Sequence, residues 1–162
     1  MRQLLDLEAI LQQLIAEHGK LLKHVDAYQS AMKAVDPRAM DTAGNLQEAT
    51  RLRIAGLESR RRLLTQQIGR LLKVDGDVTL ARIAELQPAR KAALLKLRDE
   101  LKAVMTQIAS RSHVAGKLAG AVLGHLNTVV RLLAGAVEQA GVYTKHGVPR
   151  VSARIGVMEA VA

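Results

Sequence analysis

The sequence predicts an all-α protein: an elongated antiparallel helical bundle or coiled coil of three long helices plus one short helix, with an irregular C-terminal tail. Composition and pattern both support this. Of the 162 residues 49% are hydrophobic, but Phe and Trp are absent and Tyr28 and Tyr143 are the only aromatic residues, so the core must be aliphatic. The chain also has only three prolines between long runs of Leu, Ala, Arg, Lys and Gln, whereas β-sheets favour β-branched and aromatic residues with frequent turns.

The first helix is predicted from an apolar pattern that begins at Leu4. Steps of three and four residues alternate strictly from there, which is the 3.5-residue period of coiled-coil packing and places all the positions on one side of a helix. His18 is the one interruption and is interpreted as a polar residue that sets the register. The helix is expected to end at Val35 or Asp36 because Pro37 disfavours helical geometry in the residue before it. The positions are Leu4, Leu7, Leu11, Leu14, His18, Leu21, Val25, Tyr28, Met32 and Val35.

A second helix is predicted over residues 38–73, with a weaker apolar pattern. Polar Gln47, Thr50 and Arg61 fall where apolar residues are expected. Residues 74–78 form a predicted turn, after which Thr79 is expected to cap a short helix over 80–86. The apolar positions of the second helix are Met40, Leu46, Ile54, Leu57, Leu64, Ile68 and Leu71.

The last helix is predicted to start after Pro88 and to run from residue 89 to about residue 139. Its apolar pattern covers Leu94 to Ile108, weakens between Ser110 and Gly116, and resumes in a shifted heptad register at Leu123. Gly116, Gly120 and Gly124 lie four residues apart, a spacing that lets another helix approach closely; a locally flexible helix is the alternative. Residues 118–137 are long enough to span a membrane, but Arg131 offsets most of the favourable insertion energy, so no membrane span is expected.

The charge is uneven along the chain. The net charge is +9, yet residues 1–37 carry four basic and five acidic groups while residues 38–73 carry eight basic and three acidic groups. The second helix is therefore basic, and it could meet phosphate, an anionic membrane surface or an acidic protein, or simply be a solvated face. The basic face consists of Arg51, Arg53, Arg60, Arg61 and Arg62.

Motifs for catalysis are absent from the sequence. Cysteine is absent, which excludes a disulfide framework and thiolate metal sites, and the five histidines show no HExxH arrangement. Neither a GxSxG motif nor a phosphate-binding glycine loop occurs. The sequence therefore predicts a protein that is not an enzyme and that needs no cofactor or metal. Acidic residues near the N-terminus argue against a signal peptide, so a cytoplasmic protein is expected.

The order of these elements resembles the FlgN family, the cytoplasmic chaperones that deliver hook-filament junction proteins to the flagellar type III export apparatus. The resemblance covers essentially the whole chain. It includes the segment Leu57-Glu58-Ser59-Arg60-Arg61-Arg62-Leu63-Leu64 and, past the last helix, Tyr143 and Gly147 within Val142-Tyr143-Thr144-Lys145-His146-Gly147.

The resemblance implies a helical chaperone body over residues 1–141 and a flexible C-terminal tail over 142–162. In the family, the C-terminal part binds helical terminal segments of FlgK-like and FlgL-like clients, and a tyrosine in the tail is implicated in docking at the export gate protein FlhA. Here the docking role would fall to Tyr143. The resumed apolar pattern suits capture of an amphipathic helix, and its client-binding candidates are Leu123, Leu126, Val129, Val130, Leu133 and Val137.

A second functional class remains open from the residues alone. A basic coiled-coil protein could bind nucleic acid or an acidic scaffold through the arginines of the second helix, although no aromatic platform for single strands is present. Salt separates the two classes, because phosphate binding weakens steeply with ionic strength whereas an apolar helix groove is nearly indifferent. The sequence leaves open whether the free chain forms a homodimer.

Overall fold

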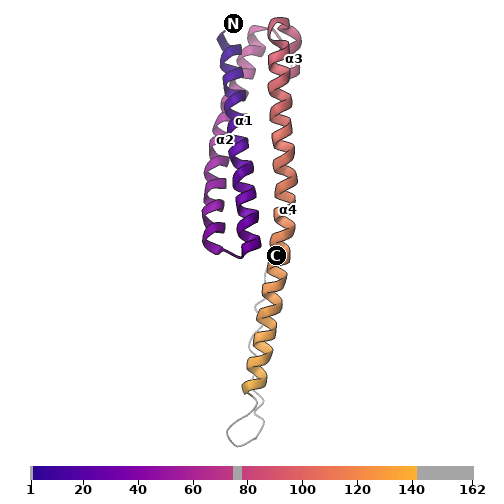
Figure 1. Ribbon diagram of the computed structural model, residues 1–162. Helices are drawn as coiled ribbons and strands as arrows, with labels where there is room; N and C mark the ends of the chain where they lie inside the picture. The colour runs from indigo at the N-terminus through magenta and orange to yellow at the C-terminus, as the bar shows by residue number, and fades with distance from the viewer. Residues whose placement is uncertain (1, 75–77, 142–162) are drawn as a thin grey trace, which may run out of the picture. The chain divides into compact units, whose positions relative to one another are not determined.

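The computed structural model describes residues 2–74 and 78–141, and the burial of their side chains as far as residue 136. The described chain is all α-helical, which confirms the predicted fold class (Figure 1). Its elements are α1 (Arg2–Ala34), α2 (Pro37–Leu71), the short α3 (Leu80–Leu86) and α4 (Pro88–Gly141). The predicted C-terminal tail lies outside the described residues.

The chain divides into two compact units, Met1–Ala119 and Gly120–Ala162. The predicted division into a body over residues 1–141 and a tail over 142–162 stays a prediction, because residues 142–162 lie outside the described part of the chain. The first unit contains α1, α2, α3 and the amino-terminal part of α4. Within it, α2 runs antiparallel to α1 and α4 runs antiparallel to α2 (Figure 1).

Local sequence fixes the turn between α1 and α2. Asp36 caps α2 by accepting a hydrogen bond from the Ala39 amide at 3.0 Å, and Pro37 occupies the first turn, where its missing N–H costs nothing. The α1 terminus closes with bonds from the Asp36 amide to the Ala31 carbonyl and from the Val35 amide to the Met32 carbonyl. This is a Schellman ending with Val35 in the left-handed position at φ 52°, where glycine is the usual residue.

The core of the first unit is aliphatic, as predicted, and α1 supplies the longest part of it. Leu7, Leu11 and Leu14 are fully buried, and they belong to one cluster with Ile68 of α2 and Leu94 of α4. The short α3 adds Ile83 and Ala84 to the same cluster. Because all four helices contribute to one cluster, the first unit folds as a single body.

The α1 pattern departs from the prediction near its end. Gln29 is buried where Tyr28 was predicted, Tyr28 is half-buried, and Val35 is exposed in the turn. The physical reason is that a straight helix has 3.6 residues per turn, so a strict 3.5-residue pattern drifts off the buried side over many turns. A step of four residues from Val25 to Gln29, in place of the expected three to Tyr28, returns the pattern to the buried side. The Gln29 side-chain amide donates a hydrogen bond to the Arg111 carbonyl of α4 at 2.6 Å.

Polar residues take buried positions of α2. Thr50 and Thr65 are buried, and each hydroxyl donates to the carbonyl four residues earlier, Leu46 and Arg61 respectively. Leu46 and Leu71, which were predicted as apolar positions of this helix, are instead exposed. His18 of α1 is buried as well, and its Nδ1 donates to the Leu14 carbonyl at 2.7 Å. Thr50, Thr65 and His18 thus each have a hydrogen-bond partner four residues earlier, so their burial leaves no unpaired hydroxyl or Nδ1 group.

Glycines 69 and 56 of α2 provide a matched test of this packing. A Cβ on Gly69 would collide with the Val78 side chain, whereas a Cβ on Gly56 would meet open space. We expect Gly69→Ala to lower the free energy of unfolding by about 1–3 kcal/mol, because the methyl overpacks the contact with Val78. We expect Gly56→Ala to raise it by roughly 1 kcal/mol through helix propensity. Urea denaturation followed by circular dichroism measures both, and equal stabilisation by the two changes would contradict the packing described.

Candidate functional site

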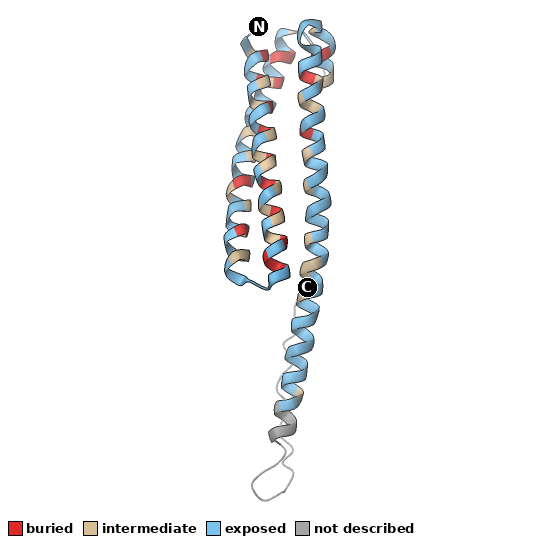
Figure 2. Ribbon diagram, in the orientation of Figure 1, coloured by how far each residue is buried: buried red, intermediate tan, exposed pale blue. Residues whose placement is uncertain are grey.

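The first candidate surface lies on α4 in the second unit. We define the α4 apolar face as Leu123, Leu126, Val129, Val130 and Leu133. All five side chains are exposed, with exposed fractions between 50% and 66%. Most of the carboxyl-terminal part of α4 carries the colour of exposed residues in Figure 2. The predicted sixth member, Val137, lies among the residues whose side chains are not described. The five described members thus form apolar surface that no described residue buries.

The pattern missed one exposed leucine of the same helix. Leu132 is 69% exposed, the largest fraction among the exposed large hydrophobic residues. At about 100° per residue it lies roughly 120° from Leu126 and 160° from Val130, so it adjoins the α4 apolar face only at the edge formed by Val129. The three-four spacing could not identify it, because a lone exposed leucine has no periodic signal.

The glycines predicted to form a close-packing groove make no close packing inside the described chain. A Cβ added at Gly116, Gly120 or Gly124 would meet nothing within 4 Å. The described residues therefore do not use these glycines to bring another helix near, and the surface they form is open to a partner.

One stretch within Pro88–Ala136 is long and apolar enough to cross a membrane by length and composition, with a mean hydropathy of 1.3. No residue of this stretch is buried. Length and composition alone are weak grounds for a span, and the charged Arg131 within residues 118–137 carries a large insertion cost. The same observation fits an exposed helix face that a partner covers.

The second candidate surface involves the arginines of α2, which the structure distributes over different sides of the helix. Arg53 and Arg60 line one groove together. Arg51 and Arg62 are exposed but do not line it. Arg61 is part-buried, and its guanidinium binds the Glu58 carboxylate at 2.9 Å. Two of the five predicted residues are thus brought together at one site.

This basic groove lies between α1 and α2 and has a volume of about 480 Å³. Its α1 side consists of Gln13, Ala16 and Glu17, and its α2 side of Arg53, Gly56, Leu57 and Arg60. Both helices present residues three and four positions apart, so the groove follows the length of the helix pair.

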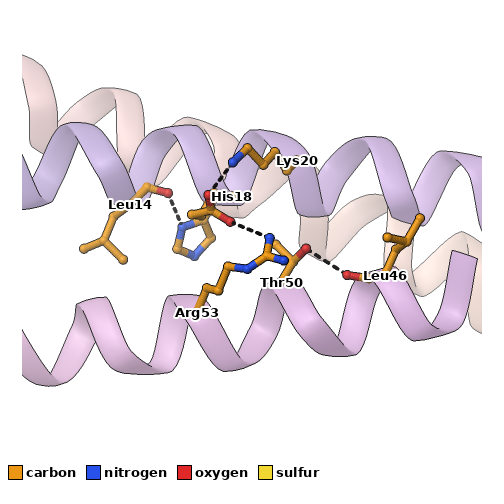
Figure 3. A network of polar contacts seen from close by, with 7 residues as sticks. Leu14, His18, Lys20, Leu46, Thr50 and Arg53 are labelled. Atoms are coloured by element: carbon orange, nitrogen blue, oxygen red, sulfur yellow. Dashed lines mark hydrogen bonds and ion pairs between the residues drawn. The ribbon is translucent and has the colours of Figure 1, made fainter.

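Glu17 is the one acidic residue that lines the basic groove. Lys20 donates a hydrogen bond to its Oε1, and the Arg53 guanidinium lies 3.7 Å from its Oε2 (Figure 3). The Lys20 hydrogen bond holds the pKa of Glu17 below its ordinary value of 4.5, and the nearby charges of Lys20 and Arg53 act in the same direction against desolvation. Glu17 is therefore a carboxylate at neutral pH.

Neither surface is lined by a cluster of side chains suited to hold a metal ion. Among residues 2–74 and 78–141, no group of three or more His, Asp or Glu side chains is placed to hold a metal ion. One surface offers apolar side chains and the other offers guanidinium groups, and both kinds of group commonly contact other macromolecules.

Comparison with known proteins gives one match. The family model described as FlgN protein matches residues 1–150, which is nearly the whole chain. No curated protein and no solved structure matches.

The lowered pKa of Glu17 gives a pH-dependent prediction. A carboxyl whose pKa is depressed by folding stabilises the fold above its unfolded pKa, and that contribution is lost as the pH falls through the lowered value. We expect Glu17→Gln to reduce the free energy of unfolding at neutral pH by less than about 1 kcal/mol, since Lys20 and Arg53 are both more than half exposed. The difference should close in acid, below about pH 4. Urea denaturation at neutral and acidic pH measures it, and a difference that persists in acid would contradict the assignment.

Proposed function

Because this chain belongs to the FlgN family, it is a cytoplasmic flagellar export chaperone for hook-associated proteins, and we propose that it holds these clients on the α4 apolar face. Membership of the family implies FlgK and FlgL as the clients and a function that is not enzymatic. The proposal concerns which residues make the contact.

The exposure of Leu123, Leu126 and Leu133 is the observation that carries the proposal. Each is more than half exposed on one helix, although burying a side chain of this size gains about 1.5–3 kcal/mol. An amphipathic client helix laid along α4 would bury these side chains, which is the helix-in-groove mode of recognition. The described part of the chain buries none of them.

The open glycines support a close approach of the client helix. Gly116, Gly120 and Gly124 lie one turn apart, and no described atom occupies the space that their missing side chains leave. Each glycine costs about 1 kcal/mol of helix propensity relative to Ala. A partner helix that packs against the glycine backbone recovers part of that cost through close contact.

Leu133 and Leu132 provide a matched pair of substitutions. We expect Leu133→Asp or Val130→Asp to abolish co-purification with a FlgK-like or FlgL-like client, because a charge cannot enter the apolar contact. Leu132→Asp introduces the same charge at the edge of the face, about 100° around α4 from Leu133, and should reduce client binding much less. Circular dichroism should show a helical protein in every case, because all three positions are exposed.

Unchanged co-purification of the Leu133→Asp protein, or equal loss with Leu132→Asp, would contradict the proposal. The competing possibility is that a second copy of the chain covers the α4 apolar face in a homodimer. Sedimentation of the free protein tests it, since a dimer held by this face would dissociate in the Leu133→Asp variant.

We further propose that Tyr143 docks the chaperone at an FlhA-like export gate protein. The support is the family match, which extends to residue 150, together with the position of Tyr143 two residues past the end of α4. Tyr143 itself lies outside the described residues. A tyrosine suits such a contact, since it offers a rigid apolar ring and a hydroxyl at low entropic cost.

We expect Tyr143→Ala to separate the two activities. Co-purification with the client should remain, while binding to the isolated cytoplasmic domain of the gate protein should fall by at least about tenfold, the size of a typical interface hot spot. Tyr143→Phe is the matched control that keeps the ring. Gate binding that is unchanged by Tyr143→Ala would contradict the docking role.

A further inference from the structure

We propose that the basic groove between α1 and α2 is a docking site for an acidic amphipathic helix of a partner protein, separate from the client site on α4. The groove is lined by residues of α1 and α2 alone. None of the residues that line it belongs to the α4 apolar face.

The charges of the groove select an acidic partner. Arg53 and Arg60 are seven residues apart on α2, so they lie on one side of the helix about 10.5 Å apart along its axis. Arg60 forms no ion pair with any described residue, and the ion pair of Arg53 with a described residue is the long 3.7 Å approach to Glu17. Acidic residues at the same seven-residue spacing on a partner helix would match both guanidinium groups.

The form of the groove favours a helix as the bound element. Gly56 lies between the two arginines, and a Cβ there would meet open space. Ala16 stands on the α1 side, so small residues line both walls near the centre. A third helix placed over an antiparallel pair can then approach the backbone closely, as in helical bundles.

Exposed leucines next to the groove favour a protein over a nucleic acid. Leu52 and Leu63 are 66% and 56% exposed. At about 100° per residue they lie roughly 40° and 20° from Gly56 around α2, so they flank one edge of the groove without lining it. A phosphate backbone gains nothing from contact with exposed leucines, and the Glu17 carboxylate in the groove would repel its negative charge. An amphipathic helix can place leucines against Leu52 and Leu63 and carboxylates against the arginines.

A synthetic peptide is the direct probe: an amphipathic helix with glutamates seven residues apart and leucines between them, labelled for fluorescence anisotropy. We expect it to bind the full-length chain at least about tenfold more tightly than a scrambled peptide of the same composition, which has the charge but not the pattern. Arg60→Glu should weaken binding by at least about tenfold. Gly56→Leu should do the same by filling the groove, while the protein stays folded because the space is open.

Arg62→Glu is the matched control, because it makes the same charge change two residues away at an exposed position outside the groove. Apart from the small loss of affinity that any reduction in the positive charge of the protein causes, it should change peptide affinity by less than about twofold. Leu133→Asp should leave peptide binding intact, and Arg60→Glu should leave client binding intact, so failure of this proposal and failure of the client site are distinguishable.

Several results would overturn the proposal. They are absence of peptide binding, equal binding of the scrambled peptide, equal loss with Arg62→Glu, and tighter binding of a DNA duplex with the steep salt dependence of phosphate contacts. The proposal would also be overturned if the chain self-associates and the self-associated form no longer binds the peptide, because a second copy of the chain would then occupy the groove.

Discussion

The first unit depends on the aliphatic core that α1 shares with every other helix. Leu7, Leu11 and Leu14 form the centre of one cluster to which α2, α3 and α4 each contribute. Without large aromatic rings, this core has to be assembled from leucine, isoleucine and alanine at regular spacing, and long helices are the elements that provide it. Burial of polar residues such as Gln29 and Thr50 is tolerated because each has a hydrogen-bond partner close by.

The preference of leucine for burial also points to the surface that the described residues leave exposed. In the first unit, Leu94 and Leu101 of α4 are buried in the shared core, whereas in the second unit Leu126 and Leu133 of the same helix are exposed. A leucine side chain favours burial equally in both places, so the difference lies in the supply of partners. This chain belongs to the FlgN family, and our proposal is that the client supplies the partner that the exposed part of α4 lacks.

Much of the fold could be predicted from the sequence, because Pro37, Thr79 and Pro88 mark helix boundaries and the α1 pattern marks the core. The burial of Gln29 in place of Tyr28 could not be predicted. It depends on the drift of a straight helix from a 3.5-residue period and on the hydrogen bond that Gln29 donates to the Arg111 carbonyl of α4. The exposed leucines of the α4 apolar face could be identified as an apolar stretch, but only burial distinguishes a free surface from core. The basic groove could not be predicted, because the arginines of α2 are close in sequence yet point in different directions.

The central claim is that the client covers α4 between residues 120 and 136. Hydrogen–deuterium exchange of the chaperone with and without a FlgK-like or FlgL-like client tests it most directly, since amide protection reports where structure is gained. The account predicts that the client slows exchange strongly within residues 120–136 and leaves residues 4–32 of α1 unchanged. Protection confined to α1 and α2, with residues 120–136 exchanging as in the free protein, would contradict it.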